Sequence, residues 1–365
     1  MTNSLVTAIV PQLPPAIDGL GDYGLNLARQ LYQDFGVQTR FVVGSPSWSG
    51  NGVTDFEVAV VAECSTAALL RRLPTDSTAT VLLHYVGYGY ARRGCPSWLV
   101  QGLRAWRGQS EARRLVTMFH EVYARRGSIW NSQFWTSDYQ RFLASRLIQC
   151  SDRCVTSNPA FSQLIEQFSQ GKHRQVPILP VFSNIGEPKV LLPLADRARR
   201  LVVFGGRGPR SRVYGRSLTG LVRACEELQI DEVLDIGPPL VDELPKVAGR
   251  QVKALGILPS HEISELLATS YAGFFDYPIT FLGKSGVFAA YCAHRVLPVG
   301  GSYPVASEAG VMAEQHYWQV EQDAEGIDEI RAQRIADVAY GWYEGHCLAA
   351  QASLFSEVLH RSFKQ

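Results

Sequence analysis

A lysine, a serine and a glycine stand where a loop of the C-terminal half enters an apolar helix. Lys284, Ser285 and Gly286 come just before the apolar run VFAAYCA. The first amides of a helix lack partners within the helix and carry a partial positive charge, so with the lysine and the hydroxyl they can bind phosphate. The segment lacks the first glycine of the phosphate loop of nucleotide hydrolases, so nucleotide hydrolysis is not implied. Helix capping alone would also account for Ser285.

Three arginines follow a predicted strand of the same half. The strand RRLVVF runs into the glycine-rich stretch that carries Arg207, Arg210 and Arg212. Arginine recognises phosphate through two parallel hydrogen bonds, so we expect a flexible cationic loop that binds a diphosphate. A solvated basic loop with no ligand is the simpler alternative.

A glycine-rich turn also follows the first predicted strand, SLVTAIV. Gly19, Gly21 and Gly24 have the GxGxxG spacing, and a helix begins there, so bare amides could approach a phosphate or a sugar. A plain turn would need no ligand. A proline-rich loop separates these glycines from the strand, and no acidic residue closes the next strand, TRFVVGS. A nicotinamide or flavin cofactor is therefore not expected.

Two histidines end predicted strands of the N-terminal half. His84 and Tyr85 close TVLL, and His120 and Glu121 close LVTMF. Histidine at a strand end can hydrogen-bond a sugar hydroxyl near neutral pH, although such a residue is often structural. Aromatic side chains nearby, including Trp135, could stack on an acceptor or simply fill the core.

These residues sit in a regular alternation of strands and helices. Apolar strands such as ATVLLHYV and RRLVTMFHEVY alternate with helical stretches along the whole chain. This alternation predicts an α/β fold with parallel sheets that carry helices on both faces. Ligands of such sheets bind beyond the carboxyl ends of the strands, which is where the candidate residues stand.

The chain divides in two according to its length and to one proline-rich segment. Its 365 residues exceed what one core usually supports, and the pattern breaks between about 172 and 200. We predict an N-terminal Rossmann-like domain over 1–182, a second one over 183–345, and a final helix at about 346–365 that crosses back to the first.

Composition and residue spacing indicate which classes of binding partner are not expected. The net charge is +1 and no run of basic residues occurs, so a nucleic-acid partner is not expected. No His, Asp or Glu set has metal-ligand spacing and no DxD pair is present, so no metal and no cofactor are expected.

Location is predicted from the cysteines and from hydropathy. Seven scattered cysteines, an apparently absent signal peptide and the lack of an 18-residue apolar stretch predict a cytoplasmic protein. Peripheral contact with the inner face of a membrane is a further possibility, through an amphipathic patch of four apolar side chains beside Arg104 and Arg107. The four are Trp98, Leu99, Leu103 and Trp106.

The order of these motifs resembles that of GT-B retaining glycosyltransferases of the glycogen-synthase-like and sucrose-synthase-like group, over essentially the whole chain. The stretch IDGLGDYGLNLARQL looks like the group's glycine loop and first helix, and TMFHEVY resembles its strand and histidine. The resemblance implies that Gly19 and Gly21 face the donor diphosphate and that His120 lines the donor sugar site. Arg207 matches the group's pyrophosphate arginine, and Arg210 or Arg212 would replace its lysine.

The stretch from Gly256 to Gly300 resembles the group's signature block, which closes here at Pro298 and Val299. The group carries two glutamates in this block, the second on the donor ribose. Gly283 and Tyr291 occupy the matching positions. We then expect Lys284 and Ser285 to take over the contact with the diphosphate.

The resemblance implies a metal-independent, retaining transfer of a sugar from a nucleotide sugar to an acceptor. We expect His120 and Asp22 to be catalytic, and we expect His84, Tyr85, Glu121 and Trp135 on the acceptor side. The donor diphosphate should contact Arg207, Arg212, Lys284, Ser285, Gly286, Gly19 and Gly21. Two alternatives remain: a sugar-nucleotide epimerase or hydrolase on the same architecture, and a non-catalytic protein that binds sugar nucleotides.

Overall fold

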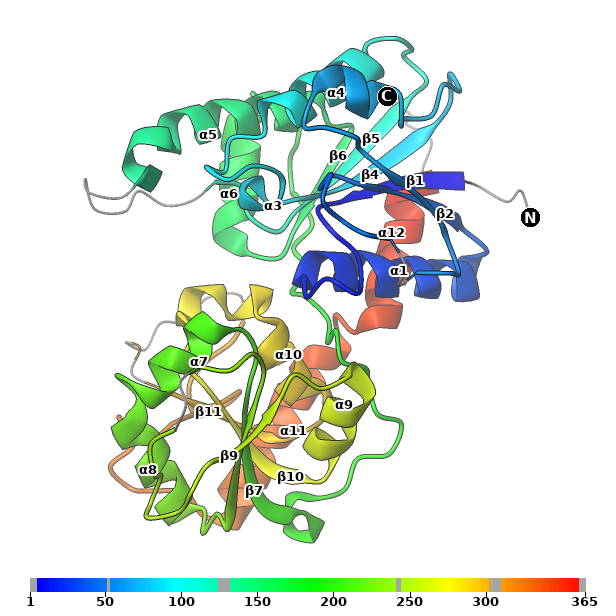
Figure 1. Ribbon diagram of the computed structural model, residues 1–365. Coiled ribbons are helices and arrows are strands. Elements are labelled where there is room, and N and C mark those ends of the chain that lie inside the picture. Colours follow the sequence, from blue (N-terminus) through cyan, green and yellow to red (C-terminus); the bar gives the residue numbers. More distant parts are fainter. Residues whose placement is uncertain are drawn as a thin grey trace. The chain divides into compact units, whose positions relative to one another are not determined.

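The chain forms two compact units. The computed structural model describes residues 5–50, 53–123, 132–240, 244–301, 303 and 310–360, with 132–135 described in their backbone only (Figure 1). One unit comprises Met1–Leu179 together with Leu348–Gln365, and the other comprises Pro180–Cys347. The sequence prediction had put the borders after residues 182 and 345.

The N-terminal unit is built on a parallel sheet of six strands in the order β3-β2-β1-β4-β5-β6. The strands are β1 (Leu5–Val10), β2 (Gln38–Val43), β3 (Glu57–Val60), β4 (Thr80–Tyr85), β5 (Arg114–Phe119) and β6 (Arg153–Thr156). The helices are α1 (Gly19–Phe35), α2 (Thr66–Leu70), α3 (Gly87–Tyr90), α4 (Ser97–Arg107), α5 (Ser132–Cys150), α6 (Pro159–Phe168) and α12 (Leu348–His360).

The C-terminal unit is built on a second parallel sheet of six strands, in the order β12-β11-β10-β7-β8-β9. The strands are β7 (Ala198–Phe204), β8 (Glu232–Ile236), β9 (Lys253–Gly256), β10 (Ser270–Phe275), β11 (Leu297–Gly300) and β12 (Trp318–Gln319). The helices are α7 (Arg207–Tyr214), α8 (Leu218–Glu227), α9 (Ser260–Ala268), α10 (Gly286–Ala293) and α11 (Glu329–Glu344), with short 3-10 turns η1 (Leu194–Asp196) and η2 (Ile279–Lys284).

The central strands are apolar because helices cover both of their faces. In β4 and β5 every residue after the first is buried, and in β10 all six are. Strands buried on both faces have continuous apolar runs rather than alternating ones, which is the pattern the sequence shows. The predicted α/β class with parallel sheets is therefore confirmed.

Helix α12 returns the end of the chain to the N-terminal unit. It packs against α1, and the two helices lie side by side (Figure 1). The phenol of Tyr23 on α1 donates a hydrogen bond to Oε1 of the buried Gln351 on α12. The last helix is thus held by apolar packing and by one buried polar contact.

The stretch after β7 is a helix and not the flexible loop that its glycines and arginines suggested. Helix α7 begins at Arg207, with Gly206 as its N-cap. Pro209 lies in the first turn, where a missing amide proton costs no helical hydrogen bond. The prediction of a flexible cationic loop was therefore wrong.

The amphipathic patch proposed for membrane contact belongs to the core. Its four apolar side chains on α4 are all buried. Helix α4 packs so closely on α2 that a Cβ on Gly102 would lie 2.7 Å from the Leu69 side chain. The indole of Trp106 donates to the carbonyl oxygen of Pro74 at 2.8 Å. The apolar face of α4 could be predicted from the sequence, but its packing against α2 could not.

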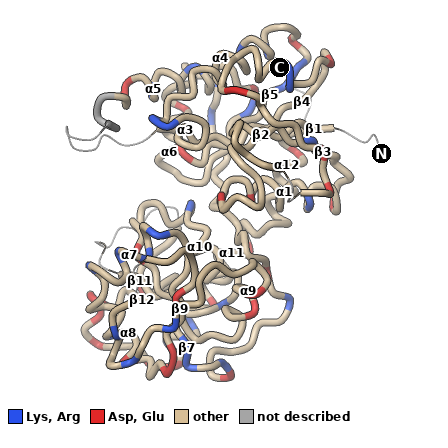
Figure 2. Tube along the Cα trace, viewed as in Figure 1, with Lys and Arg blue, Asp and Glu red and all other residues tan. Residues whose placement is uncertain are grey.

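Positions of Lys and Arg and positions of Asp and Glu are interspersed along the backbone of both units (Figure 2). Of the helices that the structure describes, none is both long and apolar enough to span a membrane.

Candidate functional site

A cavity of about 140 Å³ lies at the carboxyl ends of β7 and β10 in the C-terminal unit. Parallel α/β sheets bind their ligands at this end. Its lining comes from β7, α7, β10, the end of η2 and the start of α10. The residues are Val203, Phe204, Pro209, Arg210, Val213, Phe274, Phe275, Asp276, Tyr277, Lys284, Ser285, Gly286 and Val287.

Lys284, Ser285 and Gly286 form one wall of this cavity at the start of α10. Ser285 is the N-cap, and its hydroxyl accepts a hydrogen bond from the amide of Phe288 at 3.2 Å. A Cβ on Gly286 would meet no atom within 4 Å, so the space in front of this glycine is open. Because the first amides of a helix point out of its end, this wall offers amides, a hydroxyl and a nearby ammonium to an anion.

The turn after β7 approaches the same helix start. Gly205 has a φ of +123°, and a Cβ there would lie 3.0 Å from Cγ2 of Val287. Only glycine suits this backbone conformation and this distance. Two residues on, Arg207 is exposed at the start of α7, and no hydrogen bond or ion pair within the described part of the chain engages it. Arg207 does not line the cavity itself.

Arg210 is a structural residue. Its guanidinium is buried against the carboxylate of Asp235 on β8, with Nε 3.0 Å from Oδ2 and a second contact to Oδ1. It also donates to the carbonyl oxygen of Pro238 at 2.8 Å. Arg210 and Arg212 were the two candidates to replace the pyrophosphate lysine of the glycosyltransferase group that the motifs resemble. Because Arg210 is part of the core, Arg212 is the remaining candidate.

Asp276, directly after β10, holds two arginines. Its buried carboxylate accepts from Nε and Nη2 of Arg216 at 2.9 and 2.6 Å, from Arg212 Nε at 3.3 Å, and from the hydroxyl of Ser217 at 2.7 Å. Burial alone would raise the pKa of Asp276, but the hydrogen bonds and positive charges around it hold that pKa below its usual value. Arg212 is half-exposed and does not line the cavity.

Neither position of the paired glutamates offers a carboxylate. Gly283 is buried, and its carbonyl oxygen accepts from the amide of Val181 at 2.7 Å. Tyr291 is also buried, and its hydroxyl lies 2.9 Å from the carbonyl oxygen of Val202 and 3.1 Å from that of Phe274. Its ring fills the space over Gly273, where a Cβ would come within 2.3 Å of it. Tyr291 is therefore a core residue that fastens α10 to the sheet.

The N-terminus of α1 is occupied by a carboxylate of the chain itself. Asp18 caps the helix and accepts from the amide of Leu20 at 3.3 Å. A Cβ on Gly21 would lie 2.2 Å from the main-chain oxygen of Gln12, so this glycine allows the helix to approach the preceding loop. Gly19 is the first helical residue. The predicted contacts of Gly19 and Gly21 with a diphosphate would have to form beside this carboxylate.

Asp22 lies one turn further and titrates unusually. Burial, and next the charge of Asp18, raise the pKa of Asp22 to about 6. At about pH 6 this carboxyl is therefore half protonated, and a minor protonated fraction remains at neutral pH, so it can exchange a proton in this range.

The two strand-end histidines meet each other. His84 near the end of β4 is fully buried, and its Nδ1 lies 3.3 Å from Nε2 of His120, which follows β5. The Tyr23 ring stands edge-on to both, with centroid distances of 5.5 and 4.8 Å. The main-chain amide of His120 donates to the carbonyl oxygen of Tyr85 at 3.0 Å. The sequence thus located both histidines but not the tyrosine that packs on them.

The other predicted acceptor residues have different surroundings. Tyr85 is buried and packs edge-on against Phe119 at 5.4 Å, so its ring is part of the core and the expected stacking surface is wrong for this residue. Glu121 is half-buried, directly after His120. The side chain of Trp135 lies outside the described residues.

Some residues of the site escaped sequence reasoning. Asp276 follows the strand YAGFF, so the strand-end rule could have found it. No sequence signal pairs Tyr23 with Gln351, because 328 positions separate them.

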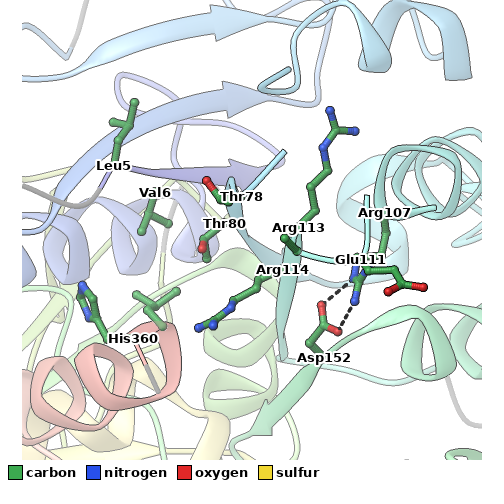
Figure 3. A pocket seen from close by; sticks show the side chains of 12 residues that line it. Leu5, Val6, Thr78, Thr80, Arg107, Glu111, Arg113, Arg114, Asp152 and His360 are labelled. Carbon is green, nitrogen blue, oxygen red and sulfur yellow. Dashed lines mark hydrogen bonds and ion pairs between the residues drawn. The ribbon is translucent and has the colours of Figure 1, made fainter. Parts of the chain in front are cut away.

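A further cavity, of about 460 Å³, lies at the opposite end of the N-terminal sheet, where β1, β4 and β5 begin (Figure 3). Its charges are largely paired within the wall. Arg107 contacts both carboxylate oxygens of Asp152 at 2.9 Å, and the buried Arg113 donates to the carbonyl oxygens of Thr75 and Trp106 at 2.7 and 2.8 Å. Arg107, Asp152 and Arg113 are thus engaged within the wall of this cavity.

No group of three or more His, Cys, Asp or Glu side chains placed to hold a metal occurs in the described ranges. The seven cysteines are all free thiols.

No protein-family profile matches the sequence, and no curated protein matches it. Solved glycosyltransferase structures match the fold. An alpha-glucosyltransferase in complex with UDP-glucose and DNA containing an abasic site is 10% identical, with a TM-score of 0.62 over 98% of this chain and 99% of that chain. AviGT4, a glycosyltransferase of avilamycin A biosynthesis, is 15% identical, with a TM-score of 0.53 over 98% and 97%. The pneumococcal O-GlcNAc transferase GtfA, in complex with UDP and GlcNAc, is 8% identical, with a TM-score of 0.58 over 98% and 99%.

At these identities the likeness establishes the fold. The chain has the two-domain α/β architecture of GT-B glycosyltransferases along its whole length.

Proposed function

We propose that this protein is a glycosyltransferase that moves a sugar from a nucleotide sugar to an acceptor. The observation that carries the proposal is the start of α10, where Lys284, Ser285 and the open space at Gly286 face a cavity beyond the ends of β7 and β10. In a fold of this kind that position suits two linked phosphates. Two of the three structures named above contain UDP or UDP-glucose, so UDP-sugars are the first donors to test.

The chemistry follows from charge. As the bond between the sugar and the diphosphate breaks, negative charge grows on the leaving group, and fixed positive groups stabilise that charge. Lys284, the amide of Gly286, Arg207 and Arg212 supply them in this proposal. Because the chain supplies these cations itself, we propose that transfer needs no divalent metal.

In the N-terminal unit, we propose that His120 and Asp22 lie at the reacting sugar. His120 hydrogen-bonds a hydroxyl of the donor sugar, and Asp22, with a pKa near 6, exchanges a proton at the acceptor. Glu121 and Trp135 belong to the acceptor side, and the buried His84 lies behind His120 and has no acceptor surface of its own. Retention of the anomeric configuration follows the family that the motifs resemble. We place the reaction in the cytoplasm, in keeping with the seven free thiols.

The replacement of the second glutamate by a buried tyrosine favours one rival, a protein that binds sugar nucleotides without turning them over. Turnover separates the possibilities. The purified protein is incubated with UDP-, GDP- and ADP-sugars, each with and without a panel of acceptors, and in the presence and absence of EDTA.

We expect a glycosylated product of retained configuration that forms only when acceptor is present and is unaffected by EDTA. Consumption of the donor alone would identify a hydrolase or an epimerase. Binding without any product across the panel would identify a binding protein.

A further inference from the structure

A buried pair of imidazoles stands behind the face on which His120 is proposed to act. His84 Nδ1 and His120 Nε2 are 3.3 Å apart, and the Tyr23 ring packs against both. Tyr23 is itself fixed through its hydroxyl to Gln351 of α12. The arrangement joins β4, β5, α1 and α12 of the N-terminal unit, so the orientation of the His120 ring is set by packing on several sides.

His84 is neutral. It is fully buried, and burial lowers its pKa from 6.5 to about 3. Helix α1 covers this side of the ring, since a Cβ on Gly24 would lie in van der Waals contact with the imidazole, at 3.5 Å. At neutral pH the ring therefore carries one proton, which must sit on Nδ1 or on Nε2.

The surroundings decide between the two nitrogens. Nε2 of His84 is buried and has no hydrogen-bond partner among the described residues. A proton on Nε2 would create a buried donor with nothing to accept it, whereas a proton on Nδ1 points at the ring nitrogen of His120. Buried unpaired N–H groups are rarer than unpaired acceptors, so Nδ1 carries the proton.

We propose that His84 is a positioning residue that donates its Nδ1 proton to Nε2 of His120 and so fixes His120 as its Nδ1–H tautomer. Nε2 of His120 then accepts and cannot also carry a proton without facing the N–H of His84. His120 therefore serves the sugar as a neutral, oriented hydrogen-bonding group and not as a general acid. This inference deepens the proposed function, because it assigns the manner in which His120 meets the donor sugar.

The tautomer can be read directly from the imidazole nitrogens. Protein labelled with ¹⁵N at its eight histidines is examined by NMR without any donor or acceptor, and the His120 signals are assigned by their loss in His120→Gln. Two variants of His84 are compared. His84→Asn keeps an N–H near the place of Nδ1, and His84→Leu removes it at similar volume.

We expect His120 to show the Nδ1–H pattern in the wild type and in His84→Asn, and to lose that preference in His84→Leu. A purely structural role for His84 would lower the melting temperature of His84→Leu without changing the tautomer. An Nε2–H pattern at His120 in the wild type would overturn the proposal, and this needs no variant to fold. Because no substrate is present, the result stands even if the proposed glycosyl transfer fails.

Discussion

Single residues decide which positive groups of the C-terminal unit can meet a ligand. Arg210 and Arg207 are three positions apart on α7, yet one is buried against Asp235 and the other is exposed without a partner in the described structure. A guanidinium that is itself buried against a carboxylate, as that of Arg210 is, is unavailable to a phosphate, because moving it would break the pair and leave the carboxylate uncompensated. Arg212 differs, because its guanidinium is half-exposed and it shares Asp276 with a second arginine. The positive side chains that could bind a diphosphate are therefore the exposed or half-exposed ones.

The clearest residue-level prediction concerns Tyr291. Its hydroxyl can donate to the carbonyl oxygen of Val202 or of Phe274, so Tyr291→Phe should lower the free energy of unfolding by about 1 kcal/mol. Introducing a carboxylate with Tyr291→Glu, as in the glycosyltransferase group that the motifs resemble, should cost roughly 3 kcal/mol or more, because it buries an unpaired carboxylate. Urea denaturation measures both. Wild-type stability in Tyr291→Glu would mean that this side chain reaches solvent or a ligand.

At the scale of elements, helix starts determine the electrostatics of each unit. Helix α10 opens with Lys284 and a glycine that faces open space, whereas α1 opens with Asp18 and Asp22. The first start is suited to an anion. The second already holds a carboxylate, so it is better suited to hydroxyl groups or to a proton.

This difference predicts a pH dependence for Asp22. Its pKa is about 6 in the folded protein and 3.8 ordinarily, so the folded state binds the proton more tightly. Ionisation therefore costs stability as the pH rises from about 4 to about 6, and the full penalty remains above pH 6. Asp22→Asn should be more stable than the wild type at pH 8, and the difference should shrink toward pH 4. An equal difference in denaturation midpoints at both pH values would contradict the assigned pKa shift.

How far the sequence leads is clearest from particular elements. The alternation of strands and helices predicted the parallel sheets, the strand-end rule predicted His84 and His120, and the helix-start pattern predicted Lys284, because all three follow from local sequence. The helix that begins at Arg207 was missed because its first turn contains a glycine and a proline, residues that are typical of loops. The pairing of Arg210 with Asp235 and the burial of α4 were missed because they depend on residues far away in the chain.

At the scale of the whole molecule, the chain crosses from the first unit to the second at residue 180 and returns at residue 348. Helix α12 thus stabilises a unit whose preceding helix, α6, ends at Phe168, far earlier in the chain. This routing links the C-terminal helix, through Gln351 and Tyr23, to the histidine pair.

The routing predicts which unit a change in α12 should affect. Phe355 is fully buried, and Phe355→Ala should cost about 3 kcal/mol. Hydrogen exchange followed by mass spectrometry should show faster exchange in α1 and unchanged exchange in β7 and β10. The exposed Ser353 on the same helix provides the control, since Ser353→Ala should leave exchange as it is. Faster exchange in the C-terminal unit would contradict the assignment of α12.

The central claim is that the start of α10 binds the diphosphate of a nucleotide sugar. Calorimetric titration of UDP, GDP and ADP into Gly286→Ala tests it, because the added methyl group enters open space and clashes with no atom of the chain. Gly341→Ala on α11 is the matched control, since its Cβ also meets nothing within 4 Å. The double variant that combines Arg207→Ala with Lys284→Ala tests whether these two positive charges contribute to nucleotide binding. Its control is Lys253→Ala, which removes a positive charge at the amino end of β9, beside Glu232.

We expect both controls to bind at least one of the three nucleotides as the wild type does. Gly286→Ala and the double variant should bind it at least tenfold more weakly, which corresponds to about 1.4 kcal/mol, with melting temperatures unchanged. Wild-type affinity in both site variants would contradict the claim.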